Sequence, residues 1–207
     1  MIVEFLNNLN FTPFWLSIKL ASISTIILLF IGTPIAWWLV NSSSRLRFII
    51  EPLISLPLVL PPTVIGFYFL IIFNQSQGVG KFWVNLTGES LTFSFFGLIV
   101  ASIIYSLPFA VQPLQNAFIL IGRSPIDAST NLGAGKVDTF CNVIIPLSIK
   151  GFIISGVLSF THTLGEFGIV LMVGGSIPGE TRVLSIAILF WATAMLPLFR
   201  SVYRSSI

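Results

Sequence analysis

The feature that most constrains this chain is its series of long apolar segments, separated by short polar stretches. Four of them, residues 13–40, 49–73, 93–119 and 151–173, are at least as long as the roughly 20 apolar residues that cross a bilayer core. Hydrophobic residues make up 55% of the chain and charged residues only 8%, far below the roughly 25% typical of soluble domains. We therefore expect an all-α, polytopic transmembrane protein with about five spans, the fifth and shortest at residues 184–199.

Positive charges assign the sides of the loops. The short loop 41–48 and the polar region 120–150 contain five of the ten basic residues, so both are expected on the cytoplasmic side. Residues 74–92, with one Lys against one Glu, are expected outside. The segment 1–11 is also expected outside and lacks the basic region and cleavage site of a signal peptide, whereas the tail 200–207 is expected inside. The basic residues that decide this are Arg45, Arg47, Arg123, Lys136 and Lys150.

Several classes of function are disfavoured by composition. The net charge of +3 is too small to suggest nucleic-acid binding, and the single cysteine, Cys141, excludes an intrachain disulfide and offers no metal cluster. The Walker-type phosphate-binding loop, Gly-x-x-x-x-Gly-Lys-Ser/Thr, does not occur, so the chain cannot hydrolyse ATP by that route. We expect no catalytic residues, no metal site and no cofactor in this chain.

The pair Trp37 and Trp38 suits an interfacial aromatic belt.

A polar island at residues 122–146 lies between two apolar segments. Ser124 followed by Pro125 and Asp127 is typical of a helix start, with a hydroxyl N-cap, proline at the first helical position and a carboxylate near the positive helix end. Gly133 and Gly135 are then expected to end the helix. The predicted helix covers about eight residues, or about 12 Å, which is too short to cross a bilayer. Without further information, a connecting loop with a local amphipathic turn remains the plainer interpretation.

The spacing within the island resembles the EAA signature of binding-protein-dependent ABC importer permeases. That signature reads Glu-Ala-Ala, three residues, Gly, nine residues, Ile, any residue and Leu-Pro. Here Asp replaces Glu, Ser replaces the second Ala, and Ile replaces Leu. In that family the loop is a coupling helix, a cytoplasmic knob seated in a groove of the ATPase subunit. The resemblance implies a coupling site at Asp127, Ala128, Ser129, Gly133 and Pro146.

The second apolar segment contains the run LPLVLPP followed by Thr63. Its prolines, Pro57, Pro61 and Pro62, interrupt backbone hydrogen bonding, which is tolerated at membrane depth only where protein or a water-filled cavity supplies partners. Two interpretations stay open: a broken helix that lines a translocation pathway, and a plain packing kink.

The fourth segment contains the run HTLGEFG, residues 162–168. A carboxylate at membrane depth costs roughly 2.5–3.5 kcal/mol on insertion scales, so Glu166 is expected to face protein or water. We expect a structural or gating role for Glu166, because a bare carboxylate would repel the substrate if the substrate is an anion. Gly165 and Gly168 are expected to allow close helix approach. His162 is expected to be a hydrogen-bonded residue of a helix interface rather than a metal ligand.

Two further stretches sharpen the resemblance. The run LGEFGIVLMVGGSIPGETRVLSIAI at residues 164–188 and the run LPLVLPPTVIGFYFL at residues 56–70 resemble the molybdate subfamily of these permeases. Together with the EAA-like loop, the resemblance covers about residues 12–190. Relatives usually continue with a longer final helix than residues 184–199 provide here, so the C-terminus is expected to be truncated or divergent.

The resemblance implies a type I ABC importer permease fold, with residues 12–199 as one transmembrane domain. It also implies a homodimeric pathway in membrane lipid, two cytosolic ATPase subunits that bind ATP and magnesium, and an external oxyanion-binding protein. The expected location is a bacterial cytoplasmic membrane, or a plastid inner envelope if the chain is plastid-encoded. Sulfate or tungstate import is the alternative within the family, and a non-transport membrane scaffold or assembly protein is the alternative outside it.

Overall fold

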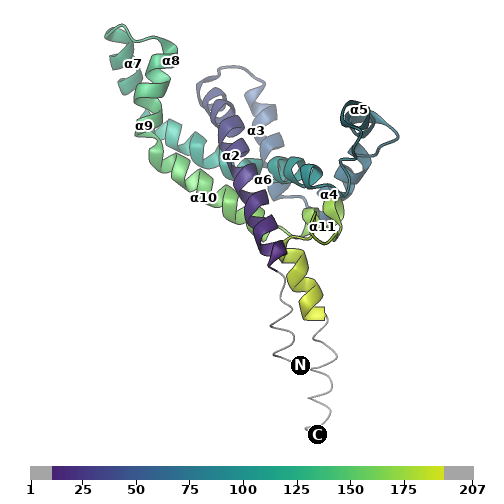
Figure 1. Cartoon of the computed structure of the whole chain (residues 1–207). Helices are drawn as coiled ribbons and strands as arrows, with labels where there is room; N and C mark the ends of the chain where they lie inside the picture. Colours follow the sequence, from purple (N-terminus) through teal and green to yellow (C-terminus); the bar gives the residue numbers. More distant parts are fainter. Residues whose placement is uncertain (1–10, 194–207) are drawn as a thin grey trace, which may run out of the picture. The chain divides into compact units, whose positions relative to one another are not determined.

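The computed structural model describes residues 11–193, which form helices joined by turns and loops and contain no strand (Figure 1). The expectation of an all-α protein is therefore confirmed. The helix Leu184–Thr193 follows the labelled elements. In chain order these are α2 (Thr12–Asn41), α3 (Arg47–Ser55), the 3₁₀ helix η1 (Leu56–Leu58), α4 (Pro62–Ile72), α5 (Gly78–Thr87), α6 (Phe95–Ile121), α7 (Ser124–Asn131), α8 (Lys136–Thr139), the π-helical turn η2 (Phe140–Ile144), α9 (Ile145–Leu147), α10 (Ile149–Gly165) and α11 (Gly168–Gly174).

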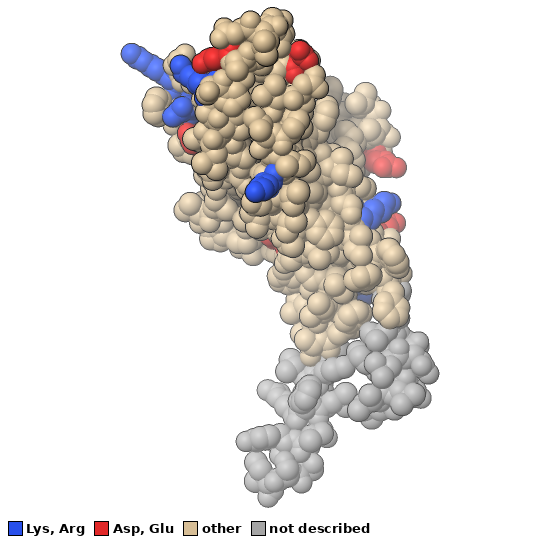
Figure 2. Space-filling model, turned by 90° about the vertical axis from the view of Figure 1, so that its left-hand side faces the viewer, with Lys and Arg blue, Asp and Glu red and all other residues tan. Residues whose placement is uncertain are grey.

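Two helices, α2 and α6, are each long and apolar enough to cross a membrane. Their 30 and 27 residues correspond to about 40–45 Å at 1.5 Å per residue, more than the roughly 30 Å of a hydrocarbon core. Up to four spans result within the described residues if each of two bent helix pairs, 47–72 and 136–165, is one span. The expected fifth span at 184–199 lies partly outside the described residues. Figure 2 shows a face of the molecule that is mostly free of charged side chains.

The chain divides into two compact units. Unit 2 comprises Ala21–Pro61 and Ser102–Thr163. Unit 1 comprises Met1–Leu20, Pro62–Ala101 and Leu164–Ile207, as far as these residues are described. Each unit has its own packing.

In unit 2, α6 and α10 pack through small residues. The buried residues of α10 recur at every fourth position, so they share one face of the helix. At Gly151, an added Cβ would collide with the side chain of Ala117 in α6, and the Ser155 hydroxyl donates a hydrogen bond of 2.9 Å to the Ala110 carbonyl. This is the close approach that small residues permit between membrane helices. The buried face consists of Gly151, Ser155, Ser159 and Thr163.

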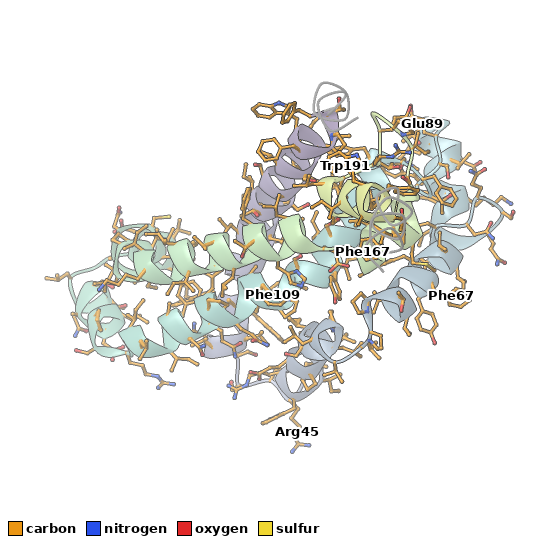
Figure 3. The ribbon with its side chains drawn as sticks, turned by 90° about the horizontal axis from the view of Figure 1, so that it is seen from below. Arg45, Phe67, Glu89, Phe109, Phe167 and Trp191 are labelled. Carbon is orange, nitrogen blue, oxygen red and sulfur yellow. The ribbon has the colours of Figure 1, made fainter. Side chains whose placement is uncertain are left out.

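His162 lies at the same interface. Its Nδ1 is 2.9 Å from the Ser106 hydroxyl, and its ring stacks on that of Phe109 with the centroids 3.9 Å apart. Figure 3 labels Phe109. The prediction of a hydrogen-bonded interface residue is confirmed, and the described residues hold no cluster of three or more potential metal ligands.

Unit 1 is held together where glycines let neighbouring backbones approach. A Cβ at Gly66 of α4 would lie 2.7 Å from Met172 of α11, and one at Gly174 would lie 2.7 Å from Leu98 of α6. The buried Thr181 hydroxyl donates to the Gly174 carbonyl at 2.5 Å. α11 is therefore packed between α4 and the first part of α6.

Candidate functional site

The polar island folds into a short helix, α7, of eight residues, as its sequence predicts. The helix begins one residue earlier than expected, with Ser124 already helical and Pro125 following it. No side chain caps the first turn, so the prediction that the Ser124 hydroxyl is the N-cap is wrong. The physical reason is that the residue before Ser124, Arg123, is itself in helical conformation and occupies the cap position.

The end of α7 depends on Gly133, as predicted. Gly133 has a φ of +87°, a left-handed conformation that glycine adopts without a Cβ penalty. Its N–H donates to the Thr130 carbonyl at 2.9 Å, and the N–H of Ala134 donates to the Ser129 carbonyl at 3.0 Å. These two bonds form a Schellman motif, which turns the chain back toward α8.

A buried hydroxyl pair joins α7 to α8. The Ser129 and Thr139 hydroxyl oxygens are 2.9 Å apart, and Ser129 also donates to the Ile126 carbonyl at 2.8 Å. Both side chains are buried in an otherwise polar region. The EAA-like spacing identifies Ser129 as a site residue but gives no sign of Thr139, because the partner lies ten positions along the chain. We refer to residues 124–139 as the α7–α8 knob.

Pro146 follows a π-helical turn. The N–H of Ile145 bonds to the Phe140 carbonyl, five residues back, where an α-helix would use the carbonyl four residues back. Pro146 has no N–H, and its ring would clash with the carbonyl four residues before it; a wider turn before it relieves that clash. Beyond it the helical segments on either side of residue 148 are bent by 71°. Pro146 therefore sits where the chain changes direction between the knob and α10.

Aromatic and aliphatic contacts fix the knob to the helices of unit 2. Ile126 and Phe140 pack against a buried apolar cluster. The Phe140 ring lies 5.3 Å from that of Trp37 in α2, and Trp37 in turn lies 5.4 Å from Phe118 in α6, both measured between centroids. Trp37 is therefore partly buried against this cluster, and the expectation that it lies with Trp38 in an interfacial belt stays a prediction. The cluster consists of Ala36, Leu39, Ile54, Val111, Leu114, Phe118 and Ile144.

The outer surface of the knob combines polar residues with two exposed apolar side chains. Leu132 is 90% exposed and Val137 is 77% exposed, although both would gain free energy from burial. Asp127 and Ala128 are also exposed on α7. This arrangement provides a projecting surface that is chemically suited to a protein partner.

The proline-rich stretch interrupts the helix of the second apolar segment. Pro57 lies in η1, Pro61 lies between helices, and Pro62 is the first residue of α4. Thr63 is exposed in the first turn of α4. In unit 1, a Cβ at Gly168 would lie 2.6 Å from Pro62, so the first residues of α4 and α11 are in close contact.

Glu166 occupies the break between α10 and α11. Its side chain is 8% exposed, and its Oε1 accepts a hydrogen bond of 2.9 Å from the N–H of Ile169. The carboxylate therefore satisfies a free N–H at the start of α11. Its backbone carbonyl accepts a 2.7 Å bond from the Ser185 hydroxyl. The fourth apolar segment, expected as one span at 151–173, is divided at this residue, and Gly165 ends α10 in open space.

A polar face on α6 was not anticipated from the sequence. Gln115 Nε2 donates to the Glu51 carboxylate at 2.8 Å, and Gln112 Nε2 donates to the Ser55 hydroxyl at 3.2 Å. These four side chains and Asn116 line a cavity of about 290 Å³ in unit 2. The signal in the sequence was three amides within five residues of an otherwise apolar segment.

A larger groove lies on the same unit. Its volume is about 980 Å³, and both Gln112 and Asn116 also reach it. Lys150, at the start of α10, contributes an exposed ammonium group to its lining, while most other lining residues, such as Leu58 and Ile154, are apolar. Gln112 and Asn116 of α6 therefore line both the cavity and the groove.

Comparison with known proteins gives consistent matches. The model of a family described as binding-protein-dependent transport system inner membrane component matches residues 29–199. The chain is 50% identical to the molybdenum transport system permease protein ModB of Azotobacter vinelandii over 180 residues, or 87% of this chain and 80% of that protein. It is 32% identical to the putative molybdenum transport system permease protein YvgM of Bacillus subtilis over 178 residues, 86% and 78% of the two chains. It is also 32% identical to ModB of Escherichia coli K12 over 167 residues, 81% and 73% of the two chains.

Proposed function

The chain belongs to the family of binding-protein-dependent transport system inner membrane components, and from this premise we propose that it is the permease subunit through which an ABC importer moves an oxyanion, specifically molybdate. The choice of molybdate as the substrate rests on the 50% identity to a molybdenum transport permease over most of both chains. The observation that carries the coupling role is the α7–α8 knob, which projects Leu132 and Val137 while its inner side is packed into the helices of unit 2.

The α7–α8 knob docks into a groove of a cytosolic ATPase subunit, which binds the ATP and magnesium. Leu132 and Val137 supply apolar contact, since fully burying one such side chain contributes about 1.5–3 kcal/mol. Asp127 and Ala128 lie on the same exposed helix. Gly133 and the Ser129–Thr139 pair keep the knob in one conformation, and Pro146 sets the direction in which α10 leaves it.

Movement of the ATPase subunits reaches the membrane helices through packed rings. Phe140 contacts Trp37 of α2 directly, and Phe118 of α6 contacts both Trp37 and Phe152 of α10. Because close-packed interiors transmit displacement rather than absorbing it, rotation of the knob turns these helices as one body. This is the physical basis for alternating access driven from the cytoplasm.

The translocation pathway runs between two copies of the chain in the cytoplasmic membrane. Gln112, which donates one hydrogen bond to Ser55, and Asn116 are exposed on a membrane-spanning helix. Amide groups left without a hydrogen-bond partner in lipid would cost roughly 2–7 kcal/mol. An aqueous pathway removes that cost. The side-chain amides then offer N–H donors to a tetrahedral oxyanion without holding it as tightly as fixed charges would.

The two chain interruptions form the movable part of this pathway. Pro57 lies within η1 and Pro61 lies between η1 and α4, while Gly165 ends α10 and Gly168 begins α11. Pro62 and Thr63 begin α4 at its contact with Gly168. Glu166 holds the start of α11 by accepting a hydrogen bond from the Ile169 N–H, so its role is to position this helix.

Uptake of radiolabelled molybdate tests the proposal. Cells that lack their own molybdate permease would express this chain together with a candidate ATPase and a candidate external binding protein from the same organism. We expect uptake that requires all three proteins and that excess sulfate does not suppress. Uptake of sulfate with no uptake of molybdate would show that sulfate is the substrate. Equal uptake with and without the chain would reject the permease assignment.

A further inference from the structure

The short helix α5 in unit 1 has three distinct faces. At 100° per residue, Val79, Phe82 and Leu86 fall on one side, where they are 56%, 69% and 70% exposed. Lys81 and Asn85 lie on a second side and are also exposed. The third side packs against the protein. The apolar face therefore stays exposed although α5 is in contact with its neighbours.

The protein-facing side fixes α5 to two neighbours. At Gly80, which is buried, an added Cβ would collide with the backbone carbonyls of Phe73 and Asn74, directly after α4. Trp83 stacks on Phe96, with the ring centroids 4.4 Å apart and the planes 11° apart. α5 is therefore held against both the end of α4 and the beginning of α6.

The contact with Phe96 sets the depth of α5 in the membrane. Phe96 lies in the first turn of α6, a 27-residue membrane-crossing helix, so it lies near the level where the hydrocarbon region meets the headgroups. Tryptophan is enriched at this level. A helix pinned here has water on one side and acyl chains on the other.

We infer that α5 is an interfacial helix that lies along the membrane surface, with Val79, Phe82 and Leu86 inserted among the lipids. The pattern of an apolar face, a polar face with a lysine and a fixed position at the end of a span is that of a helix lying in the headgroup region. α5 thereby attaches the end of the broken-helix segment α4 to the bilayer. This inference depends on α6 being a membrane span and not on which anion is transported.

Site-directed spin labelling tests it directly. Single cysteines would be placed at positions 79, 81, 82, 85 and 86 in the full chain carrying Cys141→Ser, since Cys141 is the only native cysteine. The protein would be reconstituted in vesicles of phosphatidylethanolamine and phosphatidylglycerol, and collision rates measured with oxygen and with the water-soluble complex NiEDDA. The matched control is position 132, where Leu132 is 90% exposed in the polar α7–α8 knob.

We expect labels at 79, 82 and 86 to collide mainly with oxygen, at a depth of about 5–10 Å below the headgroups. Labels at 81, 85 and 132 should collide mainly with NiEDDA. High NiEDDA collision rates at 79, 82 and 86 would show that α5 projects into water and overturn the inference. Low rates with both reagents there would show that a protein surface, such as a second copy, covers the helix, and would overturn it equally.

Discussion

The rings of Trp37 in α2 and Phe140 in η2 meet at a centroid distance of 5.3 Å and an interplanar angle of 65°. Phe140 directly follows the α7–α8 knob, and Trp37 continues to Phe118 of α6. This contact joins the part of the chain that would meet an ATPase to the helices that would line a pathway. The coupling mechanism proposed above therefore depends on it.

Replacing Phe140 by alanine should separate ATPase binding from transport. Phe140→Ala removes ring contacts with Trp37 and Phe118, each aromatic pair contributing about 0.5–1.5 kcal/mol, while the exposed surface of the knob stays intact. We expect the ATPase still to co-purify with the chain, and molybdate uptake to fall several-fold. The control is Phe48→Ala, which truncates a side chain that is 73% exposed. Undiminished uptake by Phe140→Ala would mean that this contact does not transmit the motion.

Gly133 offers a test of the docking surface. Gly133→Asp adds a charge and bulk at a position with open space around it, so the cost within the chain is mainly backbone strain, about 1–2 kcal/mol for a side chain in the left-handed region. Gly133→Ala shares the strain without the charge. We expect Gly133→Asp to weaken co-purification of the ATPase more than Gly133→Ala does. Normal ATPase binding together with normal transport in Gly133→Asp would exclude Gly133 from the contact.

The sequence predicted those parts of the site that depend on local geometry. The length of α7 and its end at Gly133 follow from residues within one turn, and the interruption in the second apolar segment follows from its prolines. By contrast, the Ser129–Thr139 hydroxyl pair and the packing of Trp37 against Phe118 and Phe140 depend on partners brought together by folding. Neither could be derived from composition or spacing.

The break at Glu166 is another feature that depends on a contact formed by folding, here within an apolar segment. Hydropathy alone predicts one continuous span at 151–173, because a single carboxylate changes the window average little. The structure divides the segment there because the carboxylate binds the N–H of Ile169 and starts a new helix. The sequence alone does not predict the amide-bearing face of α6 either. The role of Gln112, Gln115 and Asn116 depends on the cavity and the groove that these residues line.

Variants at Glu166 should distinguish the loss of charge from the loss of a hydrogen-bond acceptor. Glu166→Gln retains an oxygen for the Ile169 N–H, so we expect partial uptake with normal membrane abundance. Glu166→Leu leaves that N–H without its partner, at a cost of about 1–3 kcal/mol, and should abolish uptake. Glu89→Leu, at an exposed loop position, serves as the control. Transport by Glu166→Leu at the unmodified rate would show that the carboxylate neither positions α11 nor affects gating.

The polar face of α6 should affect transport without affecting assembly. Gln112→Leu and Asn116→Leu remove amides from the proposed pathway while preserving side-chain size, and we expect each to reduce molybdate uptake on the order of ten-fold, equivalent to about 1.4 kcal/mol. Ile119→Leu, on the same helix and 56% exposed, should leave uptake unchanged. If both amide variants transported normally while the control also did, the pathway would lie elsewhere on the chain.

Transport by purified components tests most directly whether this chain is the molybdate-conducting subunit of an ATP-driven importer. The chain would be reconstituted with its ATPase in proteoliposomes, with ATP and magnesium on the ATPase side and the binding protein with radiolabelled molybdate on the other. We predict accumulation of molybdate above its equilibrium level that requires both ATP and the binding protein and is lost with Gly133→Asp. Absence of ATP-dependent accumulation, in proteoliposomes whose complex is intact and hydrolyses ATP, would contradict the assignment.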